Sequence, residues 1–202
     1  MEEIRKIKEL LAEDRPEDWN GLPDIDLYMD QVVSYLSRQS VGGKAPAITS
    51  AMINNYVKDG LLPRANGKRY QKEHLVFLTA IGMLKNVLTV RDMKLLLDSE
   101  IQEGGEQAFY ARMLRETEEA FSAAELGIDP DMDESEVTSA ALRLALISCA
   151  AKTACEQLLS VARALRPEED PKAKKEQEKE AAKRAKLEKK NSKANEPKEE
   201  RP

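Results

Sequence analysis

The spacing of apolar and polar residues predicts two amphipathic helices before residue 40. In residues 1–12, apolar side chains recur every three or four positions among charged ones, which is typical of a surface helix. Residues 27–36 repeat this pattern, and Asp24 or Asp26 before them is suited to cap a helix. We interpret the second helix as the first of a helix-turn-helix, and the segment between the two helices as a linker.

The stretch 48–62 places chemically different residues on the two faces of a helix. Met52, Ile53, Tyr56 and Val57 share one apolar face at helical spacing. The opposite face carries small and polar residues, namely Ser50, Ala51, Asn54, Asn55 and Lys58. Gly60 and Pro63 then supply the usual helix-ending signals. The pattern therefore predicts a helix over 48–59 with one face that packs and one face that can read a ligand.

The next segment, 63–71, predicts a short basic hairpin. Asn66-Gly67 is the dipeptide preferred in a two-residue type I′ turn, because both residues tolerate positive φ. Arg64, Lys68 and Arg69 flank this turn. Three cations on a small hairpin beside Lys58 indicate a surface that contacts phosphate.

Residues beyond this hairpin predict more helices, and the last of them is unusual. Residues 72–88 have an apolar stripe, Thr89 begins a further helix, and another follows the Gly104-Gly105 pair as far as residue 126. The segment 136–165 carries apolar residues on nearly every face. Such a helix is either the central helix of a C-terminal bundle or packs partly against a second subunit.

The motifs MINNYVKDGLLP and KRYQKEHL extend a pattern in which an aromatic helix residue precedes Gly-Leu-Leu-Pro, a basic Asn-Gly turn and two helices. Residues 56–97 resemble the winged helix-turn-helix of MerR-type regulators. The fuller stretch resembles a bacterial domain-of-unknown-function family, numbered 1836, which is itself similar to MerR. The resemblance implies an all-α fold with one small β-hairpin wing, and it implies a homodimer.

Charge is distributed unevenly along the 202 residues, whose formal net charge is −5. Residues 44–94 hold nine basic and three acidic residues, so they form a basic island between acidic flanks. This asymmetry favours a specific partner that is itself acidic, such as duplex DNA, over indiscriminate coating of nucleic acid. Two cysteines, the absence of an opening signal peptide and the cations that interrupt 136–165 predict a cytoplasmic protein without a membrane partner.

Residues suited to catalysis or metal binding do not form a recognised set in this sequence. Gly42-Gly43-Lys44 lacks the residues that a nucleotide-binding loop needs around it, although Lys44 is suited to contact a DNA phosphate. Three alternating aspartates at 129–133 lack the Gly and Glu of a calcium loop. His74, the sole histidine, has no companion ligand and is interpreted as structural. We expect no enzyme activity, no metal and no cofactor.

The sequence thus predicts four regions and a DNA-binding transcriptional regulator. The regions are an N-terminal helix and linker (1–23), a winged helix-turn-helix (24–98), a C-terminal helical region (99–166) and a disordered charged tail (167–202). The residues expected to contact double-stranded DNA are Lys44, Ser50, Asn54, Asn55, Lys58, Arg64, Asn66, Lys68 and Arg69. The alternative is a protein-interaction adaptor that keeps the fold without binding DNA. An effector, either a small molecule or a protein, would act on the C-terminal helices.

Overall fold

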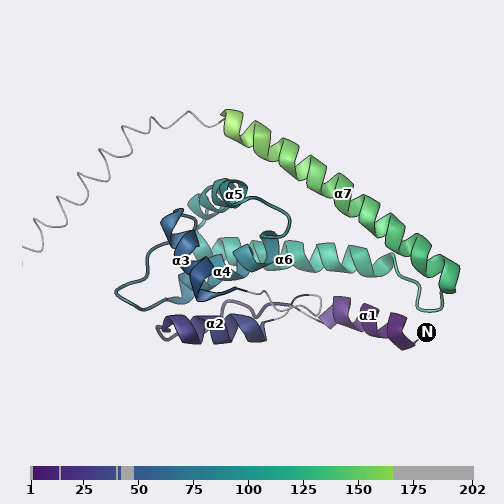
Figure 1. The fold of residues 1–202 in the computed structure, drawn as a ribbon, viewed down its shortest axis with the longest axis horizontal. Coiled ribbons are helices and arrows are strands. Elements are labelled where there is room, and N and C mark those ends of the chain that lie inside the picture. Colours follow the sequence, from purple (N-terminus) through teal and green to yellow (C-terminus); the bar gives the residue numbers. More distant parts are fainter. Residues whose placement is uncertain (1, 14, 40, 42–47, 166–202) are drawn as a thin grey trace, which may run out of the picture. The chain divides into compact units, whose positions relative to one another are not determined.

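The computed structural model describes residues 2–13, 15–39, 41 and 48–165 of the chain (Figure 1). Lys44 and the tail 167–202 lie outside these residues, and so do the predictions made for them. The chain divides into two compact units, Met1–Val161 and Ala162–Pro202. The described residues form helices α1 (Glu2–Glu13), α2 (Met29–Arg38), α3 (Ser50–Lys58), α4 (Lys72–Leu84), α5 (Val90–Gln102), α6 (Gly105–Leu126) and α7 (Glu134–Leu165).

Helix ends lie where the local sequence signals place them in most cases. Thr49 and Thr89 are the N-caps of α3 and α5, and their hydroxyls accept from the backbone N–H groups three residues later. Gly60 follows α3 with φ of +68°, a conformation that residues with a Cβ rarely adopt. The prediction of a helix ending at this glycine, and of new helices near Thr89 and Gly105, is confirmed.

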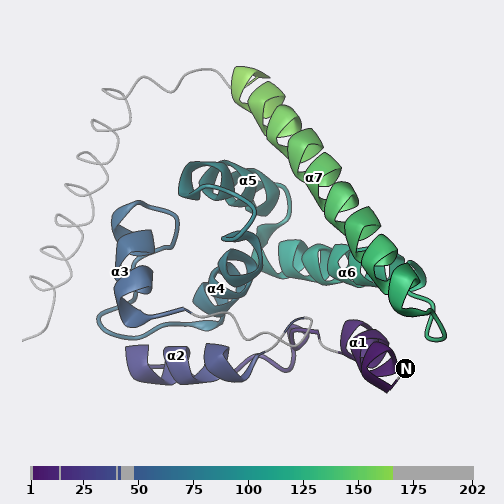
Figure 2. The ribbon, with the colours of Figure 1, turned by 45° about the vertical axis from the view of Figure 1, so that its right-hand side comes forward.

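Helix α4 is the most deeply buried helix among the described residues, and its buried side chains run without a break from His74 to Gly82. It packs against α2, α5 and α6 and lies among them in two views (Figures 1 and 2). The sequence pattern indicated one apolar stripe on this helix, which included Leu75, Leu78, Thr79 and Gly82. The structure also buries Val76, Phe77, Ala80 and Ile81, which lie outside that stripe. Neighbours on several sides explain why nearly every α4 position is apolar or small.

Helix α7 does not occupy the central position that its apolar composition suggested. Only Ala140 and Leu159 are buried among its 32 residues. The interpretation of 136–165 as the central helix of a C-terminal bundle is therefore wrong within this chain. Of the described helices, α7 alone is long and apolar enough to span a bilayer, judged by length and composition only, a test that core helices of soluble proteins also pass.

The prediction of a β-hairpin wing is wrong, because the described residues contain no β-strand. Residues 63–71 form a turn closed by a single bridge between Asn66 and Arg69, with Gly67 and Lys68 at its centre. Gly67 has φ of +67°, and no described residue other than glycine has positive φ. The type I′ turn centred on Asn66-Gly67 is therefore wrong. A positive φ at the first central residue alone is the pattern of a type II′ turn.

The start of α2 also differs from the expected one. Neither Asp24 nor Asp26 caps the helix, which begins at Met29 after Tyr28. Leu27 instead exchanges two backbone hydrogen bonds of 2.8 Å with Tyr70. The spacing of apolar residues places Leu27 in the helix, but the structure uses it in this bridge, because a buried leucine fits either element equally well.

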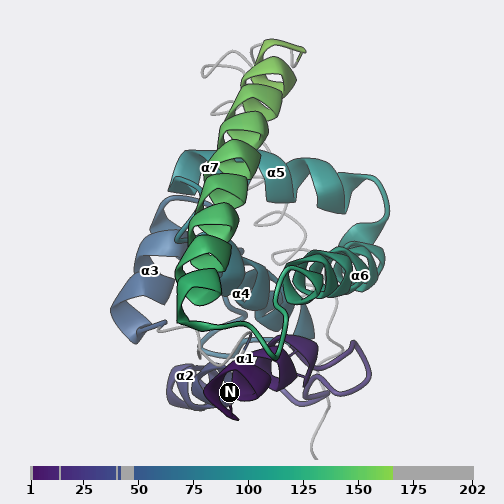
Figure 3. The ribbon, with the colours of Figure 1, turned by 90° about the vertical axis from the view of Figure 1, so that its right-hand side faces the viewer.

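One hydrophobic core runs through the predicted regions 24–98 and 99–166. Phe109 and Tyr110 of α6 belong to the same buried cluster as Leu36 of α2 and Leu78 of α4. Helix α1 has no buried residue and lies along α6 (Figures 1 and 3). The two predicted regions thus share a core, and α6 is the element that joins them.

Candidate nucleic-acid interface

Helix α3 presents its polar face to solvent because its apolar face is packed. Ile53 and Tyr56 are buried, and Met52 and Val57 pack partly against the same core. The four polar residues expected on the opposite face are all exposed, namely Ser50, Asn54, Asn55 and Lys58. Ser50, Asn54 and Lys58 follow one another at intervals of four residues, so their side chains form a row along the helix.

Both ends of α3 are fixed by hydrogen bonds outside the helix ladder. At the N-terminus the Thr49 hydroxyl accepts from the Met52 N–H at 3.3 Å. After the C-terminus the N–H groups of Leu61 and Leu62 donate to the Tyr56 carbonyl oxygen at 2.9 and 3.1 Å. The Lys94 ammonium on α5 donates to the carbonyl oxygen of Gly60. These contacts hold the polar face of α3 in a defined orientation.

The basic turn after α3 carries three exposed cations, Arg64, Lys68 and Arg69. Asn66 and Arg69 exchange backbone hydrogen bonds of 3.0 and 3.1 Å across the turn, and the Asn66 side chain is exposed. The turn is compact although it lacks strands.

His74 connects this turn to the start of α4. The Gln71 N–H donates to Nδ1 at 3.1 Å, so Nε2 carries the proton of the neutral ring and donates to the Arg64 carbonyl oxygen at 3.3 Å. The ring also meets Tyr70 edge-on, with 5.5 Å between the ring centroids. The structural role expected for His74 is confirmed, and its buried ring fixes the backbone that carries Arg64.

Arg69 is held by Tyr28, a residue that the sequence did not single out. The guanidinium carbon lies 5.2 Å from the centroid of the Tyr28 ring, and Nη2 donates to the phenol oxygen at 3.3 Å. Tyr28 occupies the N-cap position of α2 without a capping hydrogen bond from its side chain, and it is exposed. No periodic signal marks a residue that faces outward just before a helix, which is why the sequence missed it.

A cleft of about 430 Å³ brings the α3 face and the basic turn together. Asn54 lines it from α3, Gly67 and Lys68 line it from the turn, and Tyr28 and Asp30 line it from the α2 end. Asn54 and Lys68 therefore line one cleft, as a shared reading surface would require. The structure also adds one carboxylate, Asp30, to the same cleft.

A fourth basic residue near the turn has a structural role. The Lys72 ammonium forms an ion pair with Asp24, donates to the Trp19 carbonyl oxygen at 3.2 Å and lies 5.3 Å from the Trp19 ring centroid. Lys72 is only partly exposed. It fastens the linker to α4 and is not available to a phosphate.

The acidic residues near α7 have local partners. The Asp133 carboxylate accepts from the Ser135 hydroxyl at 2.7 Å and from the N–H groups of Ser135 and Glu136 at 2.8 and 3.0 Å. These hydrogen bonds, that of the hydroxyl first, lower the pKa of Asp133. Asp133 thus caps α7. Within the described residues, no three His, Cys, Asp or Glu side chains are grouped as metal ligands.

Comparison with known proteins gives a family and no described function. A family model described as a domain of unknown function, DUF1836, matches residues 17–121. None of the curated proteins and none of the solved structures compared matches the chain. The matched residues include α2 to α5 and most of α6, so they contain the whole basic surface described above. The chain therefore belongs to the DUF1836 family.

Proposed function

We propose that the protein is a DNA-binding transcriptional regulator that reads duplex DNA with α3 and the basic turn, in the manner of a helix-turn-helix. The observation that carries this proposal is the common cleft of Asn54 and Lys68, flanked by exposed Asn55, Lys58 and Arg69. None of these side chains is covered by the acidic residues of α6 or α7, because all are exposed.

The residue types divide the work of recognition between them. Asn54 and Asn55 carry amides, which pair bidentately with the adenine edge in the major groove. Ser50 and Lys58 lie at the two ends of the same polar row and would contact the flanking backbone. Arg64, Lys68 and Arg69 would bind phosphates and so orient α3. The Tyr28 ring and phenol oxygen hold the Arg69 guanidinium beside the start of α2, where it remains exposed.

The proposed regulator acts as a homodimer, and α7 is the element that would join the two copies. Leu142, Leu146 and Ile147 are more than half exposed, and so are Leu158 and Val161. A helix that exposes this many large apolar side chains is a candidate interaction surface. Two copies related by a two-fold axis would present two α3 helices to a roughly palindromic site.

A protein-interaction adaptor is the second candidate function, and Asp30 favours it. Its carboxylate lines the cleft that holds Asn54 and Lys68, where it would repel a phosphate and accept hydrogen bonds from a polypeptide. Capture of a protein partner that survives nuclease treatment, without binding to any duplex, would support this alternative.

The regulator proposal is tested by fluorescence anisotropy on duplexes enriched from a random library. Replacing Arg64, Lys68 and Arg69 by Ala should weaken binding to every sequence, and the slope of log K against log salt should flatten by about 2 to 3. Asn54→Ala should instead lose preference among sequences by about 1–3 kcal/mol.

A matched control removes three exposed cations outside this surface, Lys6 on α1, Arg115 on α6 and Arg143 on α7. This triple-alanine variant changes net charge equally and should retain the salt slope. An equal loss of DNA affinity in the two triple variants would contradict DNA binding by this surface. A selection that enriches no duplex would contradict it too.

A further inference from the structure

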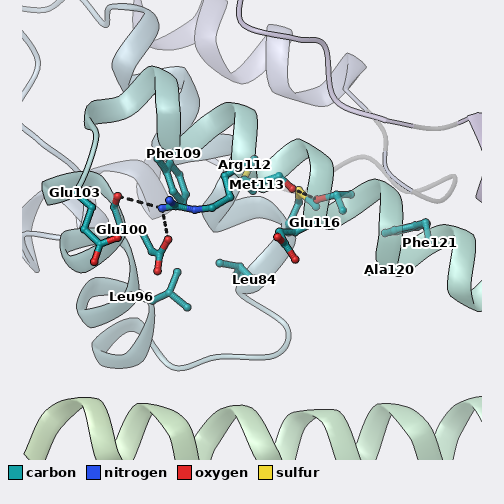
Figure 4. Close-up of a pocket in the computed structure, with 12 residues that line it drawn as sticks. Leu84, Leu96, Glu100, Glu103, Phe109, Arg112, Met113, Glu116, Ala120 and Phe121 are labelled. Carbon is teal, nitrogen blue, oxygen red and sulfur yellow. Dashed lines mark hydrogen bonds and ion pairs between the residues drawn. The ribbon is translucent and has the colours of Figure 1, made fainter. Parts of the chain in front are cut away.

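A second cavity, of about 650 Å³, opens among α4, α5 and α6 (Figure 4). Its walls are mostly apolar and come from Leu84 of α4, Leu96 of α5, and Phe109, Met113 and Phe121 of α6. This volume is within the range of small-molecule sites, which are concave, largely apolar and polar at a few points. The cavity lies apart from the basic surface and shares no lining residue with it.

The polar groups of this cavity are biased toward negative charge. Glu100, Glu103 and Glu116 line it together with one cation, Arg112. Arg112 is already committed, because its Nη2 pairs with the Glu100 carboxylate and donates to the Glu100 carbonyl oxygen at 3.3 Å (Figure 4). The pair neutralises one acid and leaves two carboxylates beside an apolar wall.

The two remaining carboxylates have little local compensation. The Glu116 carboxylate lies 3.9 Å from an exposed Arg115 guanidinium, a separation at the limit of an ion pair. Glu103 forms no ion pair with any described residue, and both glutamates are exposed. The cavity therefore offers acceptor oxygens at its edge and aromatic and thioether groups within it.

We propose that this cavity binds an organic cation with a flat apolar body and an ammonium head. The body would lie against Phe109, Met113 and Phe121, where it is removed from water. The ammonium would be attracted by the carboxylates of both Glu103 and Glu116. An anionic ligand of the same shape would meet two carboxylates and a guanidinium that already has a partner. This site is additional to the DNA surface and does not depend on it.

The test uses three fluorescent probes of one shape and different charge, with the full chain. These are 1-pyrenemethylammonium, neutral 1-pyrenemethanol and anionic 1-pyrenecarboxylate, followed by fluorescence anisotropy at low salt. The expected order of affinity is cation, then alcohol, then anion. Each carboxylate should raise the affinity for the cation over that for the alcohol about two- to five-fold, as exposed charge pairs do.

Variants locate the binding in the cavity. Glu103→Gln and Glu116→Gln should weaken the cation about two- to five-fold each and leave the alcohol unchanged. The matched control is Glu119→Gln. It removes an exposed carboxylate of α6, the helix that carries Glu116, at a position outside the cavity lining. Ala120→Phe adds bulk at a lining position on the exposed side and should weaken all three probes, while the helical circular dichroism stays that of the parent.

Several outcomes would overturn the proposal. Equal affinity for the cation and the alcohol would show that the carboxylates do not attract the ligand. A higher affinity for the anion would show that the cavity prefers negative charge. Absence of binding by all three probes would show that the cavity takes no flat apolar ligand. If Glu119→Gln lowered the affinity for the cation as much as Glu103→Gln does, the cation would be bound outside the cavity. None of these results bears on binding of duplex DNA by α3.

Discussion

Tyr110 shows at the level of one residue how the linker before α2 is fastened to α6. Its side chain is fully buried, and its hydroxyl donates to the Glu17 carbonyl oxygen at 2.7 Å. Burial raises the pKa of Tyr110 to about 12, with smaller contributions from the charges of Glu17 and Asp18. The sequence marked neither Tyr110 nor Glu17, because their contact spans 93 positions and leaves no periodic trace.

This pKa predicts how alkali destabilises the protein. The folded pKa lies above the ordinary value of 10, so the contribution of Tyr110 is complete below pH 10 and is lost as pH rises toward 12. A shift of that size corresponds to about 2–3 kcal/mol. Tyr110→Phe should flatten the fall of unfolding free energy between pH 10 and 12, measured by urea denaturation.

The exposed Tyr28 supplies the comparison for this titration, since Tyr28→Phe removes a phenol that is not buried. That variant should keep the alkaline loss of the parent. If the unfolding free energy of both phenylalanine variants falls with pH along the same curve as that of the parent, the buried hydroxyl of Tyr110 is not the source of the alkaline loss of stability.

At the scale of elements, α4 and α7 show that the same composition serves different positions. Both helices are apolar around most of their circumference, yet α4 is buried from His74 to Gly82 and α7 buries only Ala140 and Leu159. Periodicity cannot separate the two cases, because it reports which residues avoid water and not which neighbours cover them. Length did not help either, since the longer helix is the exposed one.

The exposed face of α7 carries a prediction about self-association. Replacing Leu142 and Leu146 by Glu places two charges where both side chains are 62% exposed, so the fold should be kept and the homodimer lost. Light scattering coupled to size exclusion measures the change from dimer to monomer across micromolar concentrations.

Lys152→Glu is the charge-matched control for this pair, because it also shifts net charge by −2. Residue 152 lies about 80° or more around the helix from both leucines, and it is exposed. The control should remain dimeric. A parent chain that is monomeric at all accessible concentrations would contradict the proposed role of α7.

At the scale of the molecule, one core joins regions that the sequence divided at residue 98. Phe109 and Tyr110 complete the cluster built by α2 to α5, so the segment 24–98 lacks part of its own interior. The family match across residues 17–121 covers the same combination of elements. The basic residues therefore come from one continuous stretch, 44–94, whereas the core is assembled from residues far apart in the sequence.

This organisation predicts which fragments fold. The isolated segment 24–98 should show no cooperative unfolding, because losing two buried aromatics at about 3–5 kcal/mol each consumes a typical domain stability of about 5–15 kcal/mol. A fragment of residues 15–126 keeps both aromatics, so it should unfold cooperatively. It omits α1, which has no buried residue, and α7, which buries only Ala140 and Leu159. Urea denaturation followed by circular dichroism distinguishes the two fragments, and a sharp transition for 24–98 would contradict the prediction.

The sequence by itself determined the features that depend on neighbours within a few positions. The two faces of α3, its end at Gly60, the Thr89 cap and the break at Gly104-Gly105 all follow from local spacing and turn chemistry. Exposure of Asn54, Asn55 and Lys58 follows in the same way, because polar residues opposite a packed face point to solvent. Arg64, Lys68 and Arg69 are exposed because charged residues of a surface turn stay in water. The DNA contact assigned to both sets of residues stays a prediction.

Only the tertiary structure decided features made by residues distant in sequence. The bridge of Leu27 with Tyr70 moved the start of α2, the support of Arg69 by Tyr28 shaped the basic turn, and the meeting of three helices created the second cavity. The turn closed without strands, and α7 remained uncovered. The physical reason is common to all of these: a residue's own pattern fixes what it can pack against, while chain topology selects which surface meets it.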